Sequence, residues 1–112
     1  MASKYLLEQN DFNININNMQ DKEQIKNKKI LYKTLAKVVQ KYRKAQNKSI
    51  YELAPICSMS TNSWNRIEKG MSLDPSFTTI WKISEALDIP FNILMTELCE
   101  KLGDDFSLSG LN

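Results

Sequence analysis

The sequence predicts an all-α fold of five helices in a single domain. From about residue 29 to residue 102, apolar side chains recur at helical spacing, and no run alternates as a half-buried strand would. Only three glycines and three prolines occur among the 112 residues, so few positions favour breaking a helix. A chain of this length is large enough for one small helical core.

The first expected helix runs from about Lys29 to Gln46 and opens a domain expected to cover residues 29–103. Its inward-facing positions are Leu31, Leu35, Val38, Val39 and Tyr42.

Residues 1–28 form an asparagine-rich N-terminal arm ahead of this helix. Apolar and asparagine residues alternate from Phe12 to Asn17, which predicts a short strand. Because an isolated strand is unstable, we expect the arm to be flexible, to pair with a second copy, or to pack on the domain. The tail, residues 104–112, is expected to fray unless Phe106 and Leu108 pack against a neighbour.

The second and third helices are short and are joined by a tight turn between Ser49 and Gly70. Ser49 and Glu52 have the spacing of a capping box, which starts a helix. Ser60 can cap the next helix through its hydroxyl, and Gly70 can end that helix because glycine adopts the left-handed conformation without a Cβ clash. Trp64 and Ile67 share the inward face of the second helix of the pair. Its outward face carries Thr61, Asn62, Asn65, Arg66 and Lys69.

The fourth helix starts after Ser76 and ends near Leu87, and the fifth runs from about Pro90 to Leu102. Trp81 is expected at the edge of the core or in a dimer contact. The fifth helix carries an apolar stripe wider than a small core needs, which predicts a dimer seam. The seam residues are Phe91, Leu94, Met95, Leu98 and Leu102.

Two helices joined by a tight turn, the second with a polar face, are typical of proteins that insert one helix into the major groove of DNA. Residues 49–70 resemble the lambda-repressor and Cro-like (XRE-type) helix-turn-helix family. They contain its S-x-x-E-L-A opening and its R-I-E-x-G close, and residues 75–89 resemble its downstream P-S-L-x-T-L signature. The resemblance covers about residues 31–98. It implies a five-helix, lambda-repressor-like domain that binds double-stranded DNA, with an ion pair between Arg43 and Glu68 that orients the second motif helix.

Three residues depart from the family pattern. Ile50 stands where a glutamine that contacts the DNA backbone is common, and Ser58 stands where the turn usually has glycine. Pro55 lies within the first motif helix and should bend it, because proline lacks the backbone N–H. We expect these departures to leave the fold intact and to change individual DNA contacts relative to the family pattern.

The outward residues of the second motif helix are the candidate DNA contacts. Asn62 can bond adenine through both atoms of its amide, and Arg66 can bond guanine or hold a phosphate. Thr61 can meet a thymine methyl or a base edge, and Asn65 lies on the flank. The expected phosphate anchors are Ser60, Ser63, Lys69 and Lys48.

The net charge of +2 conceals an uneven distribution of charge along the chain. Residues 22–48 carry ten Lys or Arg against the single acid Glu23, whereas residues 49–112 carry four basic and nine acidic side chains. The lysine-rich segment is either an ordinary solvated helix face or the electrostatic footprint of a nucleic-acid partner.

Several function classes are disfavoured. There is no histidine, no glycine-rich phosphate loop and no nucleophile–base pair, so neither an enzyme nor a cofactor is expected. Cys57 and Cys99 are expected to be free core thiols in a reducing cytoplasm, with a disulfide or a metal site as the minor alternative. No run approaches the roughly 18 apolar residues of a membrane span, and the N-terminus lacks a secretion signal.

The sequence therefore predicts a cytoplasmic transcriptional regulator, most simply a repressor that reads a palindromic operator as a homodimer. It could equally be a DNA-binding antitoxin. The alternative class is a protein-interaction module that has kept the fold without reading DNA, with Ile50, Ile56 and Met71 exposed to a protein partner.

Overall fold

The computed structural model describes residues 14–110, and the surroundings of their side chains from residue 21 onward. The described residues form five α-helices and one 3-10 helix, with no strand among them. The elements are α2 (Ile14–Ala45), α3 (Ile50–Leu53), η1 (Ala54–Cys57), α4 (Thr61–Glu68), α5 (Phe77–Ala86) and α6 (Phe91–Leu102). The all-α prediction with five helices is confirmed.

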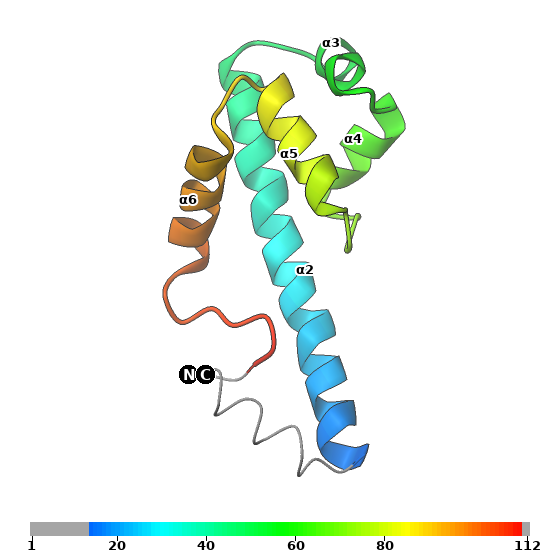
Figure 1. Ribbon diagram of the computed structural model, residues 1–112, viewed down its shortest axis with the longest axis vertical. Coiled ribbons are helices and arrows are strands. Elements are labelled where there is room, and N and C mark those ends of the chain that lie inside the picture. The colour runs from blue at the N-terminus through cyan, green and yellow to red at the C-terminus, as the bar shows by residue number, and fades with distance from the viewer. Residues whose placement is uncertain (1–13, 111–112) are drawn as a thin grey trace.

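The long helix α2 is the support for the other elements. In Figure 1 it runs along most of the molecule, with α4 beside its C-terminal half and α6 on its other side, while α5 packs against η1 and α6. Gln46, just after α2, donates a hydrogen bond from its side chain to the carbonyl of Leu87 at the end of α5. The last turns of α2 are thereby tied to the C-terminal half of the chain.

The core lies where the motif helices meet α2 and α5. Trp64 and Leu53 are fully buried, and Val39 of α2 and Ile83 of α5 are also inaccessible to solvent. The interpretation of Trp64 as a core residue is confirmed. Burial of large apolar side chains supplies most of the stabilisation in a small domain, at about 25 cal/mol per Å². This cluster therefore fixes the position of α4 relative to α2 and α5.

Helix α2 begins earlier than the sequence predicted. We expected a helix from Lys29 and a strand over residues 12–17, but residues 14–28 are the first turns of α2. The strand prediction is wrong for residues 14–17, while residues 12 and 13 lie outside the described part of the chain. The physical reason is that extending an existing helix costs far less than nucleating new structure, and no described segment offers a strand partner.

The apolar stripe of α6 is the second correction. Leu94 and Leu98 are 0% and 7% exposed, because α6 packs against α2 within one chain. Phe91, Met95 and Leu102 are half-buried against the same core. Leu94 and Leu98 therefore cannot form the predicted dimer seam, and a charge at Leu98 would disrupt the core of the protomer.

The C-terminal tail packs back on α2. In Figure 1 it descends from α6 toward the first half of α2. Phe106 is half-buried, and the buried side chain of Asn27 donates a hydrogen bond to the carbonyl of Leu108 (3.2 Å). Residues 104–110 therefore do not extend into solvent as a frayed end.

The two cysteines have different surroundings. Both thiols are free; Cys57 is buried, and burial raises its pKa, whereas Cys99 is exposed on α6. The prediction that both would lie in the core is wrong for Cys99, because the stripe of α6 that faces the core passes through Leu94 and Leu98 instead.

Candidate nucleic-acid interface

The first motif helix starts as its sequence predicts. The Ser49 hydroxyl accepts a hydrogen bond from the Glu52 N–H (3.2 Å), and the Ser49 N–H donates to the Glu52 carboxylate (3.3 Å). Both halves of the capping box are therefore present, and two N–H groups that a helix start leaves unpaired are satisfied.

Pro55 shortens this helix rather than simply bending it. Helix α3 ends at Leu53, and the chain continues as the 3-10 helix η1, with Pro55 near its beginning. A proline is tolerated there because the first residues of a helix have no intrahelical acceptor for their N–H groups. The first motif helix is thus a composite of one α turn and one 3-10 turn.

The turn between the motif helices depends on Ser58. Its backbone is left-handed (φ 57°, ψ 37°), a conformation that costs a residue with a Cβ roughly 1–2 kcal/mol. Hydrogen bonds from the Ser58 N–H to the Pro55 carbonyl (3.1 Å) and from the Met59 N–H to the Ala54 carbonyl (2.9 Å) hold it. The family's glycine position has therefore kept its left-handed geometry with serine in place.

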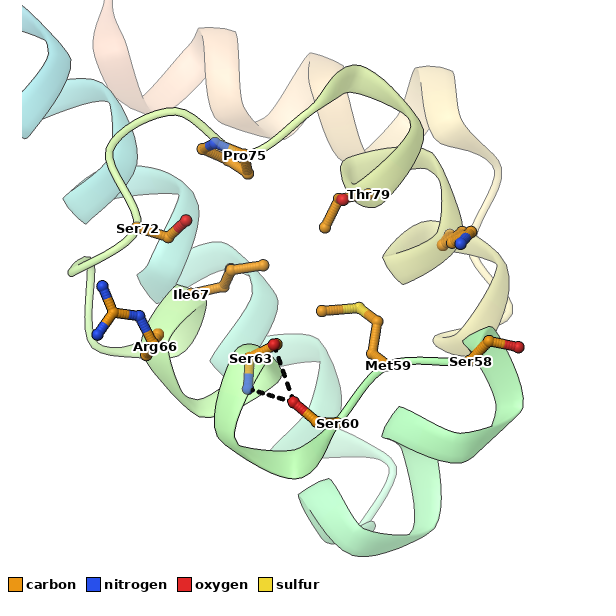
Figure 2. A pocket seen from close by; sticks show the side chains of 10 residues that line it. Ser58, Met59, Ser60, Ser63, Arg66, Ile67, Ser72, Pro75 and Thr79 are labelled. Carbon is orange, nitrogen blue, oxygen red and sulfur yellow. Dashed lines mark hydrogen bonds between the residues drawn. The ribbon is translucent and has the colours of Figure 1, made fainter.

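Helix α4 is capped at its start by Ser60. The Ser60 hydroxyl accepts a hydrogen bond from the Ser63 N–H (3.0 Å) and donates one to the Ser63 hydroxyl (2.9 Å), as Figure 2 shows. Both serines, which we expected to contact phosphates, thus already hold the first turn of α4 in the unbound protein.

The end of α4 lies very close to α2. Gly70 is left-handed (φ +69°), and a Cβ at this position would lie 3.2 Å from the Lys33 Cα. Glycine is required here both by its conformation and by the close approach of the two backbones.

The expected ion pair between Arg43 and Glu68 is present and bidentate. The Arg43 Nε and Nη2 donate to the two oxygens of Glu68 at 2.6 and 2.8 Å, and Nη1 donates to the Lys48 carbonyl (2.9 Å). The hydrogen bond to Glu68 raises the pKa of Arg43, against an opposing effect of burial.

Trp64 adds a third member to this cluster. Its indole Nε1–H donates to Glu68 Oε2 (2.6 Å), so a single carboxylate with a 3% exposed side chain links α2 to two turns of α4. Such a cluster fixes the orientation of α4, because its charged and polar groups are satisfied only in this arrangement.

The outward residues of α4 lie on two separate flanks. On one flank, Thr61, Asn62 and Asn65 line an open hollow with Ile50 and Tyr51 of α3. On the other flank, Ser60, Ser63 and Arg66 line a second hollow. Lys69 is exposed at the end of the helix, and Lys48 is exposed just ahead of α3.

The second hollow lies between α4 and α5. In Figure 2 Met59, Ile67 and Thr79 point toward its centre, and Arg66 and Ser72 lie together at one side. The remaining lining residues are Ser58, Pro75 and Lys82. Its hydroxyl groups and two cations are the types of group that bind phosphate oxygens.

Neither Asn62, Asn65 nor Arg66 has a side-chain hydrogen bond or an ion pair with any described residue. Every buried polar side-chain atom in the same part of the chain is satisfied. The groups of α4 that remain without partners are thus the solvent-facing ones we expected to contact DNA.

Two of the lysines in the basic segment have acidic partners. Lys28 pairs with Asp74 (2.9 Å) and Lys41 with Glu97 (2.7 Å). These two cations are therefore engaged in surface ion pairs within the chain, whereas Lys48 lies directly ahead of the motif helices. Tyr51, Ser72 and Lys82 were not predicted as neighbours of α4, because each comes from another element. The position of Tyr51 within the capping box is the one signal that could have indicated it.

The comparison with known families agrees with this geometry. A family model described as Helix-turn-helix matches residues 39–94, half of the chain. The chain belongs to the lambda-repressor and Cro-like (XRE-type) helix-turn-helix family. Proteins of this family are DNA-binding regulators, and the matched residues include the whole motif, the Arg43–Glu68 pair and both hollows.

No curated protein matches the chain. Within residues 14–110, no helix is both long and apolar enough to cross a membrane. The same residues contain no cluster of side chains suited to holding a metal ion.

Proposed function

We propose that this DNA-binding helix-turn-helix protein is a sequence-specific transcriptional repressor that reads a palindromic operator as a dimer. Helix α4 would enter the major groove, and Asn62 would contact a base edge. The serines at the start of α4, together with Arg66, Lys69 and Lys48, would hold phosphates on either side.

The observation that carries this proposal is that the polar side chain on the inner face of α4 has hydrogen-bond partners, whereas those on the outer face have none within the described residues. Its inward polar group, Glu68, has three hydrogen bonds, whereas the amides of Asn62 and Asn65 have none with the described residues. A polar face that is rigidly presented and lacks internal partners favours recognition of an external partner with matching donors and acceptors.

A dimer is proposed because one α4 contacts only about half a helical turn of DNA, and two-fold symmetric pairs read sites about 34 Å apart. With Leu94 and Leu98 buried, the contact would use the exposed rings of α5 and the start of α6. Phe77 is 68% and Trp81 44% exposed, and Trp81 stacks on Phe91 with ring centroids 4.3 Å apart. Adjacent exposed rings are typical of an interface.

Two measurements test this function. Binding to random duplex DNA should weaken steeply with salt, because released counterions drive it, and selection from a random duplex library should enrich a two-fold symmetric motif. Sedimentation should show a dimer that Phe77→Glu abolishes and that Ile56→Glu, at an exposed residue of η1, leaves intact. A monomer at micromolar concentration, with and without the selected DNA, would rule out the dimer.

A second candidate function is a protein-interaction module without DNA reading. Ile56, in η1, and Met71, just after the motif, are 63% and 55% exposed, which favours this alternative. Ile50 does not contribute as expected, since it is half-buried against the core. Salt-independent, negligible affinity for duplex DNA would favour the interaction module over the regulator.

A further inference from the structure

The hollow beside α4 has an unusual lining for a surface that meets DNA. Ile50, Tyr51, Thr61, Asn62 and Asn65 line it, and none of these side chains carries a charge. Ile50 is half-buried, so its side chain forms part of the floor, whereas Tyr51 is 78% exposed and stands at the edge.

The lining combines two kinds of group. The carboxamides of Asn62 and Asn65, which have no partner in the part of the chain that the structure describes, can each donate and accept a hydrogen bond at once. The aliphatic side chain of Ile50, the methyl group of Thr61 and the ring of Tyr51 supply apolar contact. In the major groove, adenine presents one acceptor and one donor, which match an amide, and thymine presents a methyl group.

Guanine would find no cationic partner in this hollow. Its major-groove edge presents two acceptors, for which arginine and lysine are the usual ligands. The nearest arginine, Arg66, lines the other hollow with Ser60, Ser63 and Lys82, a set suited to phosphate oxygens. The two flanks of α4 are therefore chemically distinct.

We infer that the hollow between α3 and α4 selects A·T base pairs, with the two amides on adenine edges and a thymine methyl against Ile50, Thr61 and Tyr51. Arg66 holds a phosphate and does not read guanine. Tyr51 and Ile50 thereby become specificity-determining residues although they lie outside the recognition helix. This inference rests on the proposed function, because it requires that α4 enters the major groove.

Deoxyuridine substitution tests the methyl contact directly. Duplexes enriched from a random library are prepared with each thymine of the half-site replaced in turn by deoxyuridine, which lacks only the methyl group. Substitution at one or two positions should weaken binding about fourfold, the effect of removing one buried methyl group. The enriched half-site should have A·T pairs at those positions.

Variants then assign the methyl contact to this hollow. Two variants, Thr61→Ser (which keeps the hydroxyl) and Tyr51→Ala, should bind the thymine and deoxyuridine duplexes almost equally well, so the roughly fourfold loss of affinity at the same position should largely disappear. Ile56→Ala is the matched control, because Ile56 is exposed nearby but lies outside the hollow, and it should keep the full penalty. Arg66→Ala should weaken all duplexes alike and leave the enriched sequence unchanged.

The possible outcomes separate this inference from the proposed function. An enriched motif read through G·C pairs, or deoxyuridine tolerated at every position, would overturn the inference and leave a sequence-specific DNA binder. A deoxyuridine penalty that persists in both Thr61→Ser and Tyr51→Ala would also overturn it. Failure to enrich any sequence would overturn the proposed function and the inference together.

Discussion

The inner and outer faces of α4 differ in burial and in whether their polar groups have hydrogen-bond partners within the described residues. On the inner face Trp64, Ile67 and Glu68 are buried, and the carboxylate of Glu68 accepts three hydrogen bonds. On the outer face Asn62, Asn65 and Arg66 have no partner within the described residues. Under the proposed function, the inner face of this eight-residue helix stabilises the fold and the outer face contacts DNA, so substitutions on the two faces should affect different measurements.

The largest expected effect is on the inner face. Glu68→Ala should lower the free energy of unfolding by on the order of 3 kcal/mol, because it leaves Arg43 uncompensated and the Trp64 indole N–H unpaired. Thermal or urea melts of Glu68→Ala, Arg43→Ala and the double variant measure it. The double variant should lose much less than the sum of the two; additive losses would show that the side chains do not interact.

Asn62→Ala, on the outer face, should weaken DNA binding without lowering the stability of the fold. Affinity for the selected duplex should fall by about 1–3 kcal/mol, with a relaxed preference at one base pair, while the melting temperature stays the same. Lys69→Ala is the control on the same helix, and it should weaken all sequences alike. An unchanged enriched motif in Asn62→Ala would contradict the assignment of this residue to the groove.

Gly70→Ala tests how closely the end of α4 approaches α2. A left-handed alanine costs roughly 1–2 kcal/mol of folding stability, and its Cβ would also crowd Lys33. Ser58→Gly measures the conformational part alone, since Ser58 is also left-handed (φ 57°, ψ 37°) and already carries a Cβ. Chemical denaturation should show a loss for Gly70→Ala that exceeds the gain for Ser58→Gly, and equal magnitudes would mean that crowding contributes nothing.

The smallest effect is expected at the surface ion pair between Lys41 and Glu97, which is more exposed than the pair between Arg43 and Glu68. Hydrogen bonds from Lys41 and Tyr42 lower the pKa of Glu97. A carboxyl whose pKa is lowered on folding stabilises the protein fully above its ordinary pKa, near 4.5, and the contribution is lost as the pH falls below that value. Glu97→Gln should therefore lose this small contribution at neutral pH and match the unchanged protein at acid pH, so that its stability depends less on pH. A pH series of melts would contradict this if both proteins lost stability in parallel.

Much of the motif could be predicted because its signals are local. Ser49 with Glu52, and Ser60 with Ser63, lie three residues apart, and each pair forms a cap in the structure. The start of α2 could not be predicted in this way. The alternation at residues 14–17 favoured a strand, but helix propagation from the folded domain overrides so short a pattern.

The sequence by itself determined the helices of the motif, their caps and the polar character of the outer face of α4, because each depends on residues within a few positions of one another. Tertiary structure decided which surfaces remain free. It buried Leu94 and Leu98 of α6 against α2, joined Arg43, Trp64 and Glu68 in one cluster, and divided the polar residues of α4 between two chemically different hollows. Such outcomes depend on contacts between distant segments, and periodicity along one helix does not specify which neighbour will cover it.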